Sequence, residues 1–359
     1  MRRGVGLLGM LVLLLVGCAG APEQLAGKPV QYWPEPPDLP RYRHVATLDD
    51  GNAIRSDLDE QSFRQAMTGQ KLLRKPLPKP FSLAAGQGRL YISDTAINRV
   101  HVFDFPRRRY FQLGFRLEGE LSKVRGIALD GQGLLYAVDR GGPRVVKYDT
   151  FGLYLGEIAI GAEVVRPSGV AVTRNGSRVF VVDTGGVDSQ SHRVVAYDAD
   201  GHLVAMVGDR GAAPGQFNLP VDAVVGADGL LYVLDSGNFR VQVFDQELNF
   251  VRSWGEVGKG FGQFARPRSI AVDSDGNVYV SDAQFANVQL FSPQGELLMA
   301  LGKRGVKPGE LELVSGVAVD ELGHLYVADQ HNHKVEVYRR LSEVEGRQAL
   351  AEYRQRLGR

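Results

Sequence analysis

Six aspartates stand at one position of a repeating pattern, and their regular spacing is the first feature that could serve chemistry. Each follows a short apolar segment that contains an aromatic residue. They are Asp94, Asp139, Asp183, Asp235, Asp282 and Asp329. Carboxylates can act as acids and bases, but no reaction needs six copies of the same group. We therefore predict a structural role, in which each carboxylate accepts hydrogen bonds from backbone amides of the following loop.

Histidines and one acidic loop are the candidates for a metal site. His331 and His333 share one loop, whereas the matching loops of four other repeats contain no histidine and His192 lies in the enlarged loop of the third. The loop that begins at Asp273 resembles the start of a calcium-binding loop but lacks the glutamate that completes one. We predict no bound metal and no cofactor. His331 and His333 remain candidates for contact with a partner.

Two arginines and one aspartate are the candidates for binding a ligand. Arg125 and Arg268 occupy the same position of the repeat, and Asp222 lies one position further along in another unit. A guanidinium group binds carboxylate or phosphate through paired hydrogen bonds. The sequence predicts an anion site formed by Arg125 and Arg268. Alternatively, each arginine pairs with Asp222 or with a carboxylate of a loop.

The elements that carry these residues are predicted from the repeat. Successive repeat aspartates are 45, 44, 52, 47 and 47 residues apart. Within each unit, segments that alternate apolar and polar residues lie between glycine-containing turns, which is typical of β-strands. Four strands in about 45 residues is the size of one blade of a β-propeller. We therefore predict an all-β protein with six blades.

The repeat resembles the NHL family. The resemblance rests on the segments GQFNLP at 215–220, YVLD at 232–235 and NFRVQVFD at 238–245. It extends over residues 81–339 and is weakest in the first two units. It implies a six-bladed β-propeller, and it leaves the activity open because relatives serve in binding, scaffolding and some catalysis. The chain also looks like a branch of bacterial envelope lipoproteins with this repeat.

The two ends of the propeller are predicted to meet. The sixth unit has only three strands, and residues 43–48 form a strand-like segment that could supply the fourth and close the ring. The propeller is therefore expected over residues 43–340. Residues 341–359 are predicted to form a short amphipathic helix with Leu350, Tyr353 and Leu357, which covers an edge or a face.

Residues 54–75 are an insertion in the link between the closing strand and the first strand of blade one. Their sequence has the signals of a helix. Asp57 can cap its start, and Gly69 can end it. Phe63 and Met67 lie on one predicted face. Two alternatives follow: the helix plugs the closing blade, or it serves as a lid or a docking element in which Phe63 and Met67 contact a partner.

The N-terminus predicts export and a lipid anchor. Residues 1–17 have the basic start and apolar centre of a signal peptide, and they run into Cys18, the only cysteine of the chain. The residues around Cys18 resemble the lipobox of bacterial lipoproteins, which implies lipidation at Cys18, and the absence of an aspartate after it suggests the outer membrane. Residues 18–42 are expected to form a proline-rich spacer, in which the Tyr32–Trp33 pair could instead pack on the body.

The net charge of the chain and its predicted export limit the functions that it can have. The chain has 42 Lys and Arg against 41 Asp and Glu, for a net charge of +1, so we predict no nucleic acid partner. We predict a lipid-anchored binding or scaffold protein of the bacterial envelope that presents one propeller face to a protein partner or a small anionic ligand. The alternative is a lactonase-like hydrolase or an amidating-lyase-like enzyme that acts at the axial channel.

Overall fold

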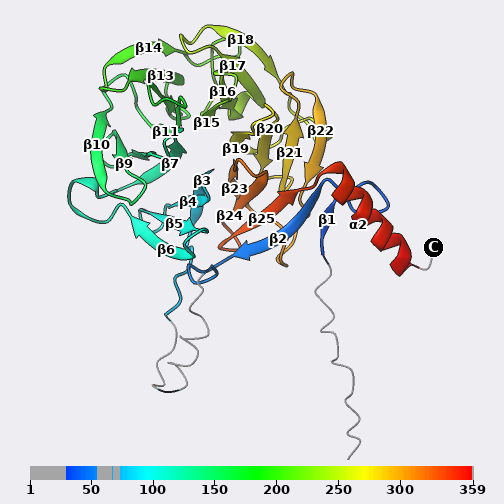
Figure 1. Ribbon diagram of the computed structural model, residues 1–359. Coiled ribbons are helices and arrows are strands. Elements are labelled where there is room, and N and C mark those ends of the chain that lie inside the picture. The colour runs from blue at the N-terminus through cyan, green and yellow to red at the C-terminus, as the bar shows by residue number, and fades with distance from the viewer. Residues whose placement is uncertain (1–29, 55–66, 68–72, 358–359) are drawn as a thin grey trace, which may run out of the picture. The chain divides into compact units, whose positions relative to one another are not determined.

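The computed structural model describes residues 30–54, 67 and 73–357 of the chain. Within these residues, six antiparallel sheets stand around a common axis as the blades of a propeller (Figure 1). The predicted fold class is therefore confirmed. The signal peptide, Cys18 and Phe63 lie outside the described residues. Met67 is described, and 72% of its side chain is exposed.

Blades one to five each contain four strands, counted from the axis outward. Blade one is β3 (Pro80–Gly86), β4 (Arg89–Asp94), β5 (Arg99–Asp104) and β6 (Arg109–Leu113). Blade two is β7 (Val124–Leu129), β8 (Leu135–Asp139), β9 (Arg144–Tyr148) and β10 (Tyr154–Ala159). Blade three is β11 (Pro167–Val172), β12 (Arg178–Asp183), β13 (Arg193–Asp198) and β14 (Leu203–Val207). Blade four is β15 (Pro220–Val225), β16 (Leu231–Asp235), β17 (Arg240–Phe244) and β18 (Phe250–Trp254). Blade five is β19 (Pro267–Val272), β20 (Val278–Asp282), β21 (Asn287–Phe291) and β22 (Leu297–Leu301). Short 3₁₀ turns follow β6 (η1, Leu117–Gly119) and β16 (η2, Ser236–Asn238).

Blade six is built from both ends of the propeller. Its strands, from the axis outward, are β23 (Val314–Val319), β24 (His324–Asp329), β25 (Lys334–Arg340), β2 (Tyr42–Leu48) and β1 (Tyr32–Trp33). His44 lies opposite Tyr338, as the predicted ring closure requires. Trp33 packs edge-on against the Tyr338 ring, with 5.0 Å between ring centroids. Of the two alternatives for the Tyr32–Trp33 pair, the structure thus shows packing on the body, as a fifth strand.

The pairing of β2 with β25 surrounds a buried carboxylate. Glu336 is fully buried and accepts a hydrogen bond of 2.6 Å from Thr47 Oγ1. The same side chain lies 2.7 Å from His44 Nε2 and 2.5 Å from Lys334 Nζ. Although burial raises the pKa of Glu336, the bonds from His44, Lys334 and Thr47 hold it below its ordinary value. The contacts of Glu336 with Thr47 and His44 therefore join β2 to β25 and close the ring.

The repeat aspartates have the structural role that the sequence indicates. All six are fully buried. Asp183 illustrates the pattern: it accepts hydrogen bonds from the amides of Val165, Arg166 and Gly185. One carboxylate thus ties the link that precedes a blade's first strand to the loop that follows its second strand, and the loops of this face are held to the strands beneath them.

The C-terminal helix α2 (Glu343–Arg356) lies outside blade six (Figure 1). Ser342 caps it through a reciprocal bond pair with Glu345. The predicted apolar face is wrong, because Tyr353 and Leu357 are exposed whereas Gly346 and Ala349 are buried. Gly346 lies so close to the turn between β1 and β2 that a Cβ there would be 2.4 Å from the Pro40 carbonyl oxygen. In the described part of the chain, no helix has both the length and the apolar character that crossing a membrane requires.

Candidate ligand-binding site at the channel mouth

The first strand of every blade contains a β-bulge near its start. In blade five, Pro267 pairs with Asp282 and Ser269 with Ser281, which leaves Arg268 unpaired in the ladder. A bulge redirects its unpaired side chain. The residues at this position are Phe81, Arg125, Ser168, Val221, Arg268 and Ser315. The backbone therefore holds Arg125 and Arg268 at equivalent places in blades two and five.

The next residue of each first strand narrows the axial channel. We call these six residues the constriction: Ser82, Gly126, Gly169, Asp222, Ser269 and Gly316. At Gly126 a Cβ would lie 2.7 Å from the Gly169 Cα, so the blades can approach this closely only because both positions lack a side chain. Where the constriction has a serine, the side chain bonds to the next blade: Ser82 Oγ accepts from the Ile127 amide at 3.2 Å.

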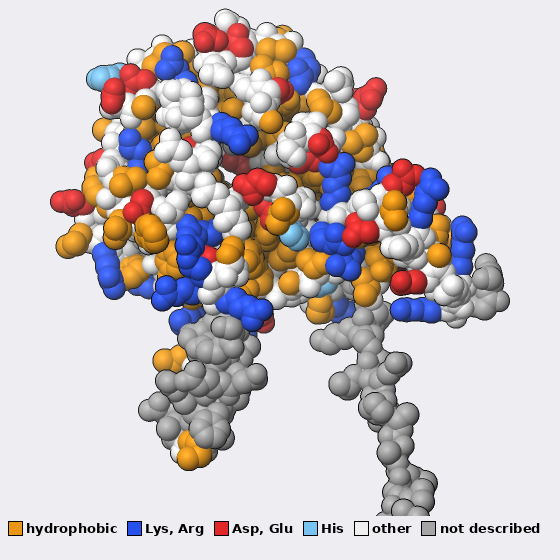
Figure 2. All heavy atoms as spheres, viewed as in Figure 1, with side chains coloured by type: hydrophobic (Ala, Val, Ile, Leu, Met, Phe, Trp, Pro, Cys, Tyr) orange, Lys and Arg blue, Asp and Glu red, His pale blue; other side chains and the backbone are white. Residues whose placement is uncertain are grey.

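One space lies on each side of the constriction. The space toward the mouth measures about 10 Å³, has Arg268 in its wall and is the size of about one water molecule. The space beyond measures about 190 Å³ and is lined by aliphatic residues of the first strands apart from Ser82 and Asp222, which line both spaces. A hollow near the centre of the ring is visible in Figure 2. The passage between the two spaces is therefore narrow.

Asp222 belongs to the constriction and bonds across to blade five. Its Oδ2 accepts 2.6 Å and 3.2 Å hydrogen bonds from Ser269 Oγ and the Ile270 amide, and its Oδ1 accepts one from the Ala223 amide. Burial raises the pKa of Asp222 to about 6. The Asp222 carboxylate forms no ion pair with Arg125 or Arg268. The alternative in which each arginine pairs with Asp222 is therefore not observed.

Five arginines form what we call the arginine cluster around the mouth: Arg125, Arg140, Arg166, Arg266 and Arg268. The pKa of Arg268 is lowered by burial and then by the positive charges of Arg266 and Arg125. Burial and the charges of Arg125 and Arg166 lower the pKa of Arg140 to about 10, although Asp183 opposes this. Among the described residues, no carboxylate forms an ion pair within 4.0 Å with any of the five. The cluster is thus a group of positive charges that no direct ion pair neutralises.

Sequence reasoning singled out two members of this cluster and missed three. Arg166 and Arg266 directly precede the proline that begins a first strand, and Lys79 and Lys123 stand at the same position in blades one and two. Arg140 follows a repeat aspartate, and its Nε donates to the Pro167 carbonyl oxygen at 3.1 Å. Four basic residues at one repeat position were the signal that could have found this basic face.

A family model for the NHL repeat matches residues 217–244 and 313–338, which belong to blades four and six. The chain is an NHL-repeat β-propeller. Neither matched segment contains a member of the arginine cluster. The match therefore identifies the repeat and leaves the ligand of this propeller open.

Several solved structures share the fold of this NHL propeller. A streptogramin B lyase is 13% identical with a TM-score of 0.54, over 74% of this chain and 95% of that one. A gluconolactonase from Xanthomonas campestris is 20% identical with a TM-score of 0.55, over 74% and 86%. An auxiliary nutrient binding protein from Bacteroides thetaiotaomicron is 12% identical with a TM-score of 0.55, over 73% and 69%. At these identities the likeness shows the fold alone.

The histidines of the NHL propeller are placed differently from one another. His331 and His333 are both exposed on the loops of blade six, and His333 Nδ1 lies 2.6 Å from the Pro78 carbonyl oxygen. They are not brought together with the arginine cluster by any described contact. His192 is fully buried, and its two ring nitrogens bond to the Leu219 amide and the Gly186 carbonyl. His192 therefore has a structural role.

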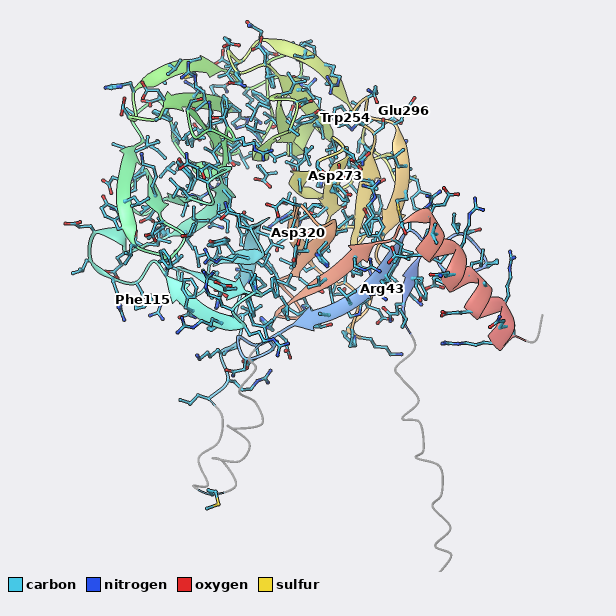
Figure 3. The ribbon with its side chains drawn as sticks, viewed as in Figure 1. Arg43, Phe115, Trp254, Asp273, Glu296 and Asp320 are labelled. Carbon is cyan, nitrogen blue, oxygen red and sulfur yellow. The ribbon has the colours of Figure 1, made fainter. Side chains whose placement is uncertain are left out.

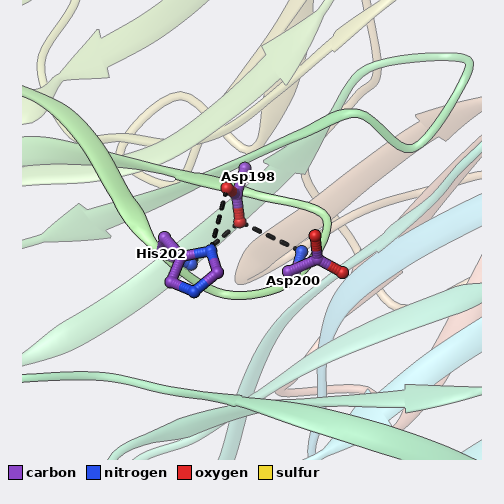
Figure 4. Close-up of side chains that lie close together, drawn as sticks. All are labelled: Asp198, Asp200 and His202. Atoms are coloured by element: carbon purple, nitrogen blue, oxygen red, sulfur yellow. Dashed lines mark hydrogen bonds and ion pairs between the residues drawn. The ribbon is translucent and has the colours of Figure 1, made fainter.

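Acidic turns account for the other metal-like arrangements. Asp273, labelled in Figure 3, accepts hydrogen bonds from the amides of Asp275 and Asn277, so the calcium-like loop is a bonded turn. Asp198, Asp200 and His202 are the one group of three such ligand types found among the described residues (Figure 4). There too, Asp198 accepts from the amides of the other two residues. Both groups repeat the same turn chemistry.

Proposed function

We propose that this NHL propeller is a binding protein of the bacterial envelope that holds an anionic group at the mouth of its axial channel. The group belongs to a small molecule or to a protein partner. The observation that carries the proposal is the arginine cluster: five guanidinium groups that come from blades two, three and five and repel one another.

An anion would relieve that repulsion. Arg125 lies over the ring of Phe81, with 5.3 Å from its guanidinium carbon to the ring centroid, so its side chain is oriented before any ligand binds. A partly buried guanidinium interacts with carboxylate or phosphate more strongly than an exposed one, because less solvent screens the charges. The constriction beneath would hold the anion at the mouth.

Calorimetric titration with citrate and with inorganic pyrophosphate tests the proposal. The Arg125→Ala, Arg268→Ala double variant should bind at least about tenfold more weakly than the wild type, as the loss of two charge-assisted contacts implies. Arg354→Ala with Arg356→Ala, which removes two exposed charges from α2, is the matched control. Equal binding by the wild type and the channel variant would exclude an anion site at the mouth.

A hydrolase or lyase acting at the channel is the second candidate, and Asp222 is the observation that favours it. A carboxyl group with a pKa of about 6 can exchange protons near neutral pH, and this one lines the spaces on both sides of the constriction. Two of the structural neighbours are, by name, a lyase and a gluconolactonase. Turnover of gluconolactone that is lost in Asp222→Asn, with unchanged melting temperature, would support catalysis.

The proposal places the protein at the outer membrane through lipid on Cys18. The support is the signal-like N-terminus and the lipobox resemblance. Wild-type protein should enter the detergent phase in a phase separation, and Cys18→Ser should stay in the aqueous phase or remain unprocessed. Mature wild-type protein in the aqueous phase would contradict the anchor without affecting the anion site.

A further inference from the structure

A large apolar groove lies on the outer side of blades one and two, away from the channel mouth. It encloses about 1,200 Å³. Its wall includes Tyr110 and Phe111 of β6, Phe115 and Leu117 of the link to blade two, and Phe151 and Leu153 of the turn before β10. Figure 3 labels Phe115 at the outer edge of the ring. We call this feature the blade 1–2 groove.

Several large apolar side chains of the groove are exposed. Leu117 is 92% exposed, Phe151 71% and Leu153 64%. Monomeric proteins rarely expose adjoining large apolar side chains, and such a patch commonly marks an interaction surface. The equivalent links of the later blades each bury one apolar residue, namely Phe217, Phe264 and Leu311, while Phe261 and Val306 of the same links are exposed.

Positive charge surrounds the groove. The guanidinium groups of Arg99 and Arg116 lie 5.0 and 4.8 Å from the Phe115 ring centroid, and Lys75 lies 5.2 Å from that of Tyr110. Exposed Arg108 and Arg109 continue the basic rim along the turn between β5 and β6. Glu118 is the one acidic residue in the groove wall among the residues described. The rim therefore complements an acidic occupant.

The backbone beside the groove favours a polypeptide occupant over lipid. Strand β6 lines the groove and is the outer strand of blade one, so amide and carbonyl groups on its free side have no strand partner within the described residues. An added strand can satisfy these groups. Hydrocarbon cannot, and covering them with lipid chains would cost free energy.

We propose that the blade 1–2 groove binds an extended segment of a partner protein in which apolar residues alternate with acidic ones. The apolar side chains enter the groove beside Phe115 and Phe151, and the carboxylates meet the rim formed by Arg109 and Arg116. Strand β6 supplies backbone hydrogen bonds. This surface is separate from the arginine cluster, so the two sites can be tested independently.

Fluorescence anisotropy with a synthetic peptide tests the proposal on the folded protein. The probe has about nine residues, glutamate alternating with leucine or phenylalanine, because a strand turns alternate residues to one face. Leu117→Asn with Phe151→Ser should weaken binding at least about tenfold, as loss of central apolar anchors does. Asn suits position 117 because its φ of 50° lies in the left-handed region. Arg109→Glu with Arg116→Glu should weaken binding similarly and reduce its salt dependence.

Leu322→Ser with Val306→Ser removes two equally exposed apolar residues elsewhere and should leave binding unchanged. A peptide with lysine in place of glutamate should not bind. Failure of the acidic peptide to bind, or equal binding by the groove variants, would overturn the proposal. Binding to phosphatidylglycerol vesicles that requires Leu117 and Phe151 would also overturn it, since it would assign the groove to a membrane surface.

Discussion

Blades four to six and blades one and two share one repeat but use their links differently. From blade four to blade five, the link runs from Gly255 to Phe264, which is fully buried and forms a parallel bridge with Val257. From blade one to blade two, the link from Gly114 to Leu121 is two residues shorter. Leu121 is still buried, but Phe115 and Leu117 turn outward. Both links therefore keep one apolar residue in the core, and in the shorter link the outward residues Phe115 and Leu117 contribute to the wall of the blade 1–2 groove.

The comparison separates what maintains the fold from what is available for binding. The segments matched by the NHL repeat model lie in blades four and six and contain neither the arginine cluster nor the blade 1–2 groove. Side chains at the repeat positions that follow the family pattern pack in the core or form hydrogen bonds. Leu117 in the short link, by contrast, presents its side chain to solvent.

The largest expected effect concerns the closing strands of blade six. A protein that begins at Asp49 lacks β1 and β2 and leaves β25 as an open edge. We expect it to aggregate, whereas a protein that begins at Gln31 should be monomeric and folded. Size-exclusion chromatography distinguishes them. A protein that ends at Ser342, without α2, should behave like the protein that begins at Gln31. Equal melting temperatures of all three proteins would refute the closing role of β2.

A pair of phenylalanines tests the two kinds of link directly. Phe264→Ala should lower the free energy of unfolding by about 3–5 kcal/mol, because it empties a fully buried site. Phe115→Ala should lower it by less, about 1–2 kcal/mol, because 36% of the side chain is already exposed while Arg99 and Arg116 lie over its ring. Urea denaturation measures both. A large loss for Phe115→Ala would show that the short link also maintains the fold.

The constriction gives a pH-dependent test within blade four. Because the folded-state pKa of Asp222 is raised to about 6, the folded protein binds more protons than the unfolded chain between about pH 4 and pH 6. Stability should therefore fall as the pH rises through this window, by up to about 2–3 kcal/mol from this group. Asp222→Asn should flatten the change. A variant with the same pH profile as the wild type would show that Asp222 does not titrate there.

The smallest effect on stability is expected for a substitution where blade two meets blade three. Gly126→Ala would place a Cβ 2.7 Å from the Gly169 Cα and should destabilise the protein by about 1–3 kcal/mol through overpacking. Gly142, in a loop of the same blade, is the control, because a methyl group added there would have open space within 4 Å. Gly142→Ala should melt within about a degree or two of the wild type. Equal melting of both variants would mean that the blades separate easily at the constriction.

The sequence predicts most of the fold because its information is repeated. Alternation, turn glycines and the buried aspartates recur six times, so each unit supports the prediction for the others. Tyr32–Trp33 has no such repetition, and two residues are too few to show a strand period. The packing of α2 through Gly346 also escapes a pattern based on apolar residues, because a glycine contributes no side chain to that pattern.

The candidate site is predictable only in part. Arg125 and Arg268 follow from their shared repeat position. Their approach to Arg140, Arg166 and Arg266 depends on bulges and link conformations that bring different repeat positions together. The blade 1–2 groove combines residues of β6, of the link to blade two and of the turn before β10, and the sequence alone does not show which of their side chains turn outward.

The bond between His44 and Glu336 joins residues that are 292 positions apart. Strand β2 therefore lacks its partner β25 until the last strand of the propeller has been made. Contacts of such long sequence separation form slowly, because a long loop must close first. Folding of this propeller is thus expected to end with its blade six, and a nascent chain stalled before Lys334 would expose β2 to whatever folding factors its compartment provides.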